Sequence, residues 1–143
     1  MAHEGQEVVG PDGGRLRFVR ITEDLLEMEA LFSGVVPLPP PHLHPRQDEH
    51  FEVLEGAVRA VISGHQLRYS AGETFEVPAG TVHTMGGDGP ARVNWQVRPA
   101  LRSADFTEAL YEGAVAAEPE SFLARYADEV RVVAPVDETQ RSP

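Results

Sequence analysis

The chain has no cysteine among its 143 residues. This absence excludes a disulfide scaffold, a thiolate metal site and a cysteine nucleophile. Long apolar runs are also missing, because no stretch approaches the roughly 18–20 residues that span a bilayer. No apolar signal-peptide segment follows Met1. We therefore expect a cytoplasmic protein that does not associate with a membrane.

Basic residues are scarce. The chain carries 12 basic and 23 acidic residues, for a net charge of −11. An acidic surface repels phosphate backbones, so nucleic acid is not expected as a partner. The length suits one domain, which at this size buries about 68–70% of its unfolded surface. Six histidines stand out against this background.

Glycine and proline divide the chain into short segments. Residues 1–14 are rich in glycine and charge and are predicted to be a mobile N-terminus. Residues 15–100 contain short runs of alternating polarity, each ended by a turn signal, which predicts an all-β sandwich or barrel. The segment from Leu25 to Phe32 alternates like a strand, although its Leu, Glu, Met and Ala residues also form helices well.

The pattern changes after residue 100. Phe106 and Leu110 begin an apolar series at helical spacing, with Ser103 or Asp105 as the expected N-cap. Pro119 suits the first turn of a second helix. We expect helices over residues 101–130 and a tail over 131–143, with one short strand at residues 132–133.

Two histidines in the middle of the chain lie one residue apart. His42 and His44 would point the same way on an extended segment, because side chains alternate along a strand. Glu49 follows five positions later, and His83 lies about forty residues further on. Imidazole and carboxylate together suit a divalent transition metal such as iron, manganese, nickel, copper or zinc.

The approach to these histidines is rich in proline. Residues 36–41 contain too many prolines for a helix or a central strand, and we predict an extended, polyproline-like segment that fixes the direction of His42. The alternative is a Pro-x-x-Pro ligand for a partner domain, which rests on composition alone.

These residues form two motifs that resemble those of the cupin superfamily. The first motif reads His42-x-His44-x4-Glu49-x6-Gly56, and the second reads Gly72-x5-Pro78-x-Gly80-x2-His83. The resemblance covers residues 34–98, and the remainder looks like the helical extension of small single-domain bacterial cupins.

The chain departs from the family pattern at two glycines. Gly34 precedes His42 by eight positions, where the family has a shorter spacing, and we expect a longer loop with the ligands in place. Gly87 stands where the family's second motif usually ends in asparagine. That asparagine is not a metal ligand in the family, so we expect a changed turn there.

The resemblance implies a fold and a metal site. The fold would be an all-β double-stranded β-helix, a jelly-roll barrel, with a C-terminal helical extension. The metal ligands would be His42, His44, Glu49 and His83, holding iron, manganese, nickel or zinc. The resemblance also implies a homodimer. The alternative from the residues is a set of hydrogen-bonded barrel histidines without a metal, although burying these groups together without a cation would be costly.

For the function, three interpretations follow from this resemblance. The first is a metal-dependent dioxygenase, similar to quercetin dioxygenases, acting on a small hydrophobic or aromatic substrate, with Glu49 also serving as a base. The second is a non-oxidative isomerase, cyclase or lyase that uses the metal as a Lewis acid. The third is a non-catalytic binding protein. The barrel segment has no lysine, which argues against a sugar isomerase.

Several further residues lie near the two motifs in sequence, and their expected positions differ. His50 should face away from Glu49, its neighbour on a strand, and His65 should lie exposed in a turn. Gln47 and Asp48 are predicted turn residues that reach the site only if the loop folds inward. Asn94 and Gln96 would face either the substrate or solvent. The apolar candidates for the barrel interior are Met28, Phe32, Phe51, Val53, Phe75, Val77, Met85 and Trp95.

Overall fold

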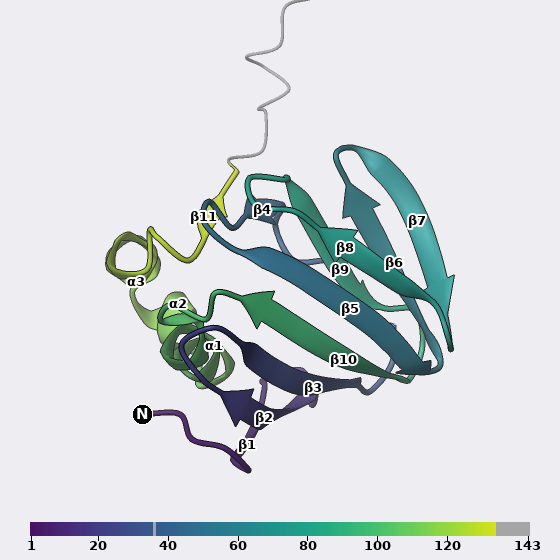
Figure 1. The fold of residues 1–143 in the computed structure, drawn as a ribbon, viewed down its shortest axis with the longest axis horizontal. Coiled ribbons are helices and arrows are strands. Elements are labelled where there is room, and N and C mark those ends of the chain that lie inside the picture. Colours follow the sequence, from purple (N-terminus) through teal and green to yellow (C-terminus); the bar gives the residue numbers. More distant parts are fainter. Residues whose placement is uncertain (36, 134–143) are drawn as a thin grey trace, which may run out of the picture.

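Two antiparallel sheets pack face to face in this chain (Figure 1). The computed structural model describes residues 1–35 and 37–133. The six-stranded sheet has the order β1 (Glu7–Val9), β2 (Arg15–Ile21), β3 (Leu26–Phe32), β10 (Ala91–Arg98), β5 (Asp48–Glu55), β8 (Thr74–Val77). The five-stranded sheet has the order β11 (Arg131–Val132), β4 (His42–Leu43), β9 (His83–Gly87), β6 (Ala57–Ile62), β7 (His65–Ser70). This confirms the expected jelly-roll barrel.

Strand β3 settles the ambiguous segment. Leu26, Met28 and Ala30 are buried, while the glutamates between them are partly exposed. This alternation is the strand period, and β3 pairs with β10 along seven residues. The apolar period therefore outweighs the helix propensity of the individual residues.

The barrel interior lies between the two sheets. Its buried residues are Phe51, Val53, Val58, Phe75, Val77, Ala91 and Val93, with Phe32, Ile62, Tyr69, Met85 and Trp95 packed against them. A second cluster covers the end of the six-stranded sheet formed by β1, β2 and β3 and includes Ala104 of helix α1 (Ser103–Tyr111). Met28, expected in the barrel interior, belongs to this second cluster.

The C-terminal helices lie beside the barrel and lead back to it (Figure 1). Helices α2 (Ala114–Ala117) and α3 (Pro119–Arg125) follow α1, and Pro119 begins α3 as predicted. Phe122, Tyr126 and Val130 form a third buried cluster. The chain then enters β11, which pairs with β4 and so reaches the histidine-bearing segment. Among the described residues, no helix has the length and apolarity to cross a membrane.

The turn between β5 and β6 depends on Gly56. Its backbone has a positive φ of 73°, a conformation that costs free energy for any residue with a Cβ. A Cβ at this position would also lie 2.1 Å from the carbonyl oxygen of Pro90. The glycine that closes the first motif is therefore required by both conformation and space.

Three sequence expectations need correction. Residues 1–14 are not wholly a mobile start, because β1 pairs with β2 and buries Val8 opposite Leu16. Neither Ser103 nor Asp105 caps α1, whose N-cap is Arg102 without a side-chain cap. The last strand covers residues 131–132 instead of 132–133. The remaining tail, 134–143, and residue 36 of the proline-rich stretch lie outside the described residues.

Candidate metal centre

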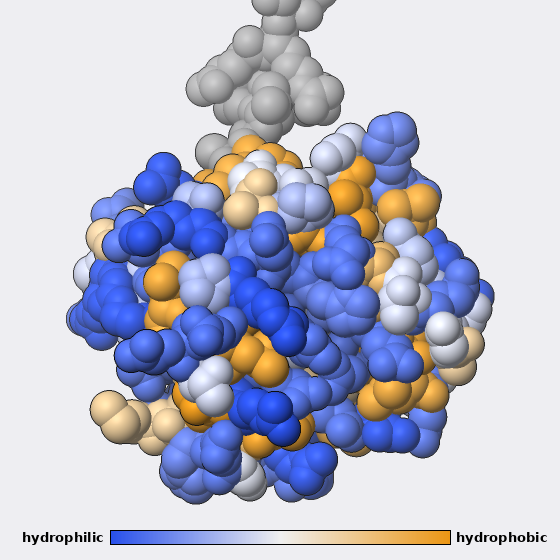
Figure 2. Space-filling model, in the orientation of Figure 1, coloured by the Kyte–Doolittle hydropathy of each residue, from blue (hydrophilic) through white to orange (hydrophobic). Residues whose placement is uncertain are grey.

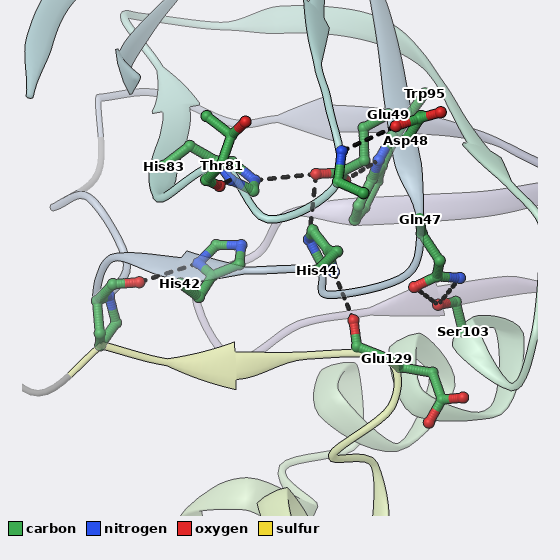
Figure 3. A network of polar contacts seen from close by, with 12 residues as sticks. His42, His44, Gln47, Asp48, Glu49, Thr81, His83, Trp95, Ser103 and Glu129 are labelled. Carbon is green, nitrogen blue, oxygen red and sulfur yellow. Dashed lines mark hydrogen bonds and ion pairs between the residues drawn. The ribbon is translucent and has the colours of Figure 1, made fainter. Parts of the chain in front are cut away.

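Three histidines converge at one end of the barrel (Figure 3). His42 lies in β4 directly opposite His83, the first residue of β9, and His44 follows β4. Their ring centroids are 4.5–5.3 Å apart. One ring nitrogen from each lies within 4.8 Å of the others, so the cluster could bind a metal ion. The spacing of His42 and His44 thus places both rings on one side of the chain, as predicted.

Each histidine uses Nδ1 to bind a main-chain carbonyl. The pairs are His42 with Pro40 at 3.0 Å, His44 with Glu129 at 2.7 Å, and His83 with Thr81 at 2.9 Å. When Nδ1 of a neutral imidazole donates to a carbonyl, Nε2 carries no proton and remains a free acceptor. The three rings are therefore held in the tautomer that offers Nε2 as a metal ligand.

Glu49 reaches the cluster from the opposite sheet. Its side chain is 1% exposed. Its Oε1 atom lies 3.1 Å from Nε2 of His44 and 2.9 Å from Nε2 of His83. Its Oε2 atom accepts a hydrogen bond from the indole nitrogen of Trp95 at 2.7 Å. The candidate centre therefore joins β4 and β9 of one sheet to β5 and β10 of the other.

Burial and the carboxylate act differently on these groups. Burial lowers the pKa of His42 to about 4. Burial also opposes a charge on His44, but the nearby negative carboxylate of Glu49 outweighs burial and raises the pKa of His44. Burial would raise the pKa of Glu49, yet the contacts with His44 and His83 hold it well below its usual range. The carboxylate is thus ionised at neutral pH.

The donor set fits a cation. The buried atoms Nε2 of His44 and Oε1 of Glu49 have no hydrogen-bond partner within the described part of the chain. With Nδ1 of His44 bonded to a carbonyl, these two atoms face each other as acceptors. A cation between them would satisfy both, and nitrogen with carboxylate oxygen is a common ligand set for divalent transition metals.

Gln47 folds inward, but toward the helices and away from the histidines. Its fully buried side chain donates to the carbonyls of Pro99 and Ala100, at 2.8 and 2.9 Å. It also exchanges hydrogen bonds with the hydroxyl of Ser103. Asp48, the other predicted turn residue, accepts from the backbone N–H of Ala79 at 2.8 Å. Both residues fix the loop that connects His44 to Glu49.

The remaining polar candidates lie outside the barrel. His50 faces away from Glu49 and bonds to Glu76, and His65 is exposed. Asn94 donates to Glu27 at 3.0 Å. Gln96 accepts from Arg98 at 2.8 Å. The surface seen in the orientation of Figure 1 is mostly hydrophilic, with scattered apolar residues (Figure 2).

An aromatic stack extends from Glu49 along the barrel interior. Trp95 stacks on Phe51 with centroids 5.7 Å apart, Phe51 on Phe75 at 4.7 Å, and Phe75 on Tyr69 at 4.2 Å. The ring planes differ by only 14–19°. The interior beside the centre is therefore an apolar wall of stacked rings, and the indole N–H at the Trp95 end of the stack is bound to Glu49.

Sequence reasoning missed the groups that orient the candidate ligands. Trp95 was predicted as barrel filling, and its bond to Glu49 was not foreseen. A buried tryptophan usually requires a hydrogen-bond acceptor, which was the available signal. The carbonyls of Pro40, Thr81 and Glu129 carry no side-chain signal, because any residue supplies one.

Comparisons with known proteins agree with this architecture. Residues 35–97 match the family described as Cupin domain. KdgF from Halomonas sp. is 27% identical, covering 68% of this chain and 86% of that one, with a TM-score of 0.57. An RmlC-like cupin from Shewanella frigidimarina is 19% identical, covering 69% and 87%, with a TM-score of 0.62. TT1209 from Thermus thermophilus is 22% identical, covering 63% and 87%, with a TM-score of 0.55. No curated protein matches the chain.

Proposed function

We propose that this chain, whose residues 35–97 match the Cupin domain family, uses its histidine cluster and Glu49 to hold one divalent transition metal for catalysis. The ligands in this proposal are His42, His44, Glu49 and His83. The substrate is a small hydrophobic or aromatic compound, and the reaction is an oxygenation of the dioxygenase type.

One observation carries the metal proposal. Nε2 of His83 and Oε1 of Glu49 are 2.9 Å apart, yet Nδ1 of His83 is already bonded to the carbonyl of Thr81. In the neutral tautomer, two lone pairs would meet in a buried site, which costs free energy unless a positive species lies between them. A single proton can serve one such contact, whereas a divalent cation serves all four candidate ligands at once.

The proposed metal would supply the reactive chemistry, and Glu49 would supply a base. His42, His44, Glu49 and His83 would hold the metal, which would supply Lewis-acid or oxygen chemistry to a bound substrate. Glu49 is ionised, and Trp95 binds its Oε2 atom, so Oε1 is the atom directed at the histidines. That oxygen could also accept a proton from a bound hydroxyl group.

The aromatic wall supports a planar, apolar substrate. The stacked rings of Trp95, Phe51 and Phe75 continue inward from Glu49, and they carry no charge that would pair with a phosphate. A flat ring with two adjacent oxygen atoms would suit a metal site of this kind while packing against the apolar interior. The wall would also exclude water from the reacting atoms.

Oxygen uptake tests the proposed reaction. Apo-protein would be loaded separately with Fe(II), Mn(II), Ni(II) and Zn(II) and incubated with catechol, a small aromatic diol, in an oxygen electrode. We expect uptake with one of the redox-active metals and none with zinc, and we expect His42→Ala to abolish it. Conversion of the probe without oxygen consumption would overturn the oxygenase and favour Lewis-acid chemistry. Absence of conversion across a panel of aromatic diols would overturn the proposed substrate class.

A further inference from the structure

The segment after the barrel supplies one of the carbonyls that orient the histidines. His44 donates from Nδ1 to the main-chain oxygen of Glu129 at 2.7 Å, across 85 residues of sequence. The other two histidines bind carbonyls only two residues away in the chain. The tautomer and ring orientation of His44 therefore depend on whether the C-terminal segment is docked.

We propose that residues 99–133 act as a clamp on the metal centre, with Glu129 as a positioning residue for His44. This inference rests on the proposed function, because it assumes that the histidines hold a metal. It adds that docking of the C-terminal segment sets the affinity of the centre, and that metal loading in turn stabilises docking.

The position of the Glu129 carbonyl is determined by a buried carboxylate. The side chain of Glu129 is 3% exposed and lies 3.2 Å from the Arg102 guanidinium, and it also accepts from the Arg102 backbone N–H at 3.3 Å. Arg102 further donates to the carbonyl of Arg125 and lies over the ring of Tyr126, 5.0 Å from its centroid. A buried carboxylate held this way fixes the backbone that carries it.

A second contact joins the same segment to the ligand loop. Ser103 follows Arg102 and bonds to Gln47, which lies between His44 and Glu49 in the sequence. The contacts thus form a closed ring from His44 to Glu129, from Glu129 to Arg102, and from Ser103 through Gln47 back to the loop. Figure 3 shows the His44–Glu129 and Gln47–Ser103 contacts of this ring. His44 and Glu49, the candidate ligands at the two ends of this loop, are therefore positioned against the helical extension.

Strand β11 completes the clamp directly beyond Glu129. Arg131 lies opposite Leu43, and Val132 lies opposite His42. The N–H of Val133 donates to the carbonyl of Pro41 at 2.9 Å. The strand that bears His42 is thereby paired on both sides, with β9 and β11. Release of β11 would expose this strand and free the ring of His44 to rotate.

The test compares Glu129→Gln and Glu129→Ala with Glu120→Gln, an exposed glutamate of helix α3. Neither change at residue 129 removes the main-chain oxygen. Any effect on His44 therefore arises from a shift in the position of that oxygen. We expect the Kd for Zn(II), measured against a competing chelator, to rise by about tenfold or more in both Glu129 variants. The Glu120 variant should bind like the wild type.

Two further readouts separate positioning from general loss of stability. In apo-protein with labelled histidine, the Nδ1–H resonance of His44 should shift or broaden in the Glu129 variants while that of His83 stays in place. In hydrogen exchange, zinc should slow the amides of Val130 and Val133 in the wild type, since coupling between two events is reciprocal. Glu129 variants that melt earlier but keep the wild-type Kd and His44 resonance would overturn the clamp.

These outcomes distinguish the two proposals. If the wild type takes up no metal, the proposed function fails, and the His44 resonance still reports whether Glu129 positions the ring. If the wild type binds metal and the Glu129 variants bind it equally well, the clamp fails and the metal centre stands.

Discussion

Trp95 donates its indole N–H to Oε2 of Glu49 at 2.7 Å, and this bond determines which carboxylate oxygen faces the histidines. Glu49 lies opposite Val97 in the sheet register, so Trp95 is its diagonal neighbour on the same face. The long tryptophan side chain spans this diagonal, leaving Oε1 near His44 and His83.

Replacing Trp95 with phenylalanine should weaken metal binding while keeping the stack on Phe51. The variant leaves Oε2 of Glu49 buried without its donor, and loss of a contact that orients a ligand typically costs 10–100-fold in metal affinity. We expect the Kd for Zn(II) to rise by about tenfold in a chelator competition. Tyr69→Phe, at the other end of the stack, is the matched control and should leave the Kd unchanged. An unaltered Kd in Trp95→Phe would show that the indole does not orient the carboxylate.

The fold and the histidine cluster were predictable because both depend on local, periodic signals. The period of two puts His42 and His44 on one side of an extended chain, and glycines such as Gly56 mark where strands must turn. The strand at Leu26–Phe32 was predicted from alternation together with the Ser33-Gly34 turn signal and the proline run that follow it.

Contacts that depend on the path of the chain were not predictable. Glu129 reaches His44 with a carbonyl group, which every residue possesses, so its identity gave no indication of this contact. Gln47 is a residue type that is ordinary in turns. It is buried because its side chain binds Ser103, the first residue of α1, and the sequence does not show this contact. Strand β1 was missed because three residues are too few to establish a period, and its burial requires β2 beside it.

Glu49→Gln should separate the need for a charge from the need for a side chain of this shape. The amide has nearly the same size and can donate to a histidine nitrogen, so we expect the apo-protein to stay folded. Metal added at a hundredfold excess over its Kd should stabilise the wild type by about 2.7 kcal/mol. In thermal unfolding, this stabilisation should appear as a higher Tm with Zn(II) than without it for the wild type. Glu49→Gln should show no such rise in Tm. Equal rises in both proteins would remove Glu49 from the ligand set.

Two glycine substitutions should test the steric role of Gly56. Both Gly56 and Gly72 have positive φ, but only at Gly56 would a Cβ meet backbone, 2.1 Å from the Pro90 oxygen. Gly72→Ala should cost about 1–2 kcal/mol of unfolding free energy from conformation alone. Gly56→Ala should cost more, because the β5–β6 turn must also move away from Pro90. Urea unfolding measures both, and equal losses would contradict the steric argument.

Tyr111 provides a test of pH dependence away from the metal centre. Burial, with a contribution from the charge of Asp12, raises its pKa to about 12. The neutral phenol is therefore favoured in the folded protein. Its contribution to stability is complete below the unfolded pKa of about 10 and is lost as the pH rises through about 12. The tyrosinate absorbance of wild type minus Tyr111→Phe should titrate near 12; a midpoint near 10 would show that the ring is not shielded.

Metal content is the most direct test of the central claim. Untagged protein would be loaded with a mixture of iron, manganese, nickel and zinc, desalted, and analysed by mass spectrometry beside a His42→Ala/His44→Ala variant and a His50→Ala control. We predict one metal per chain in the wild type and in His50→Ala, and none in the double variant. A wild type without metal, or a double variant that retains it, would contradict the proposed centre.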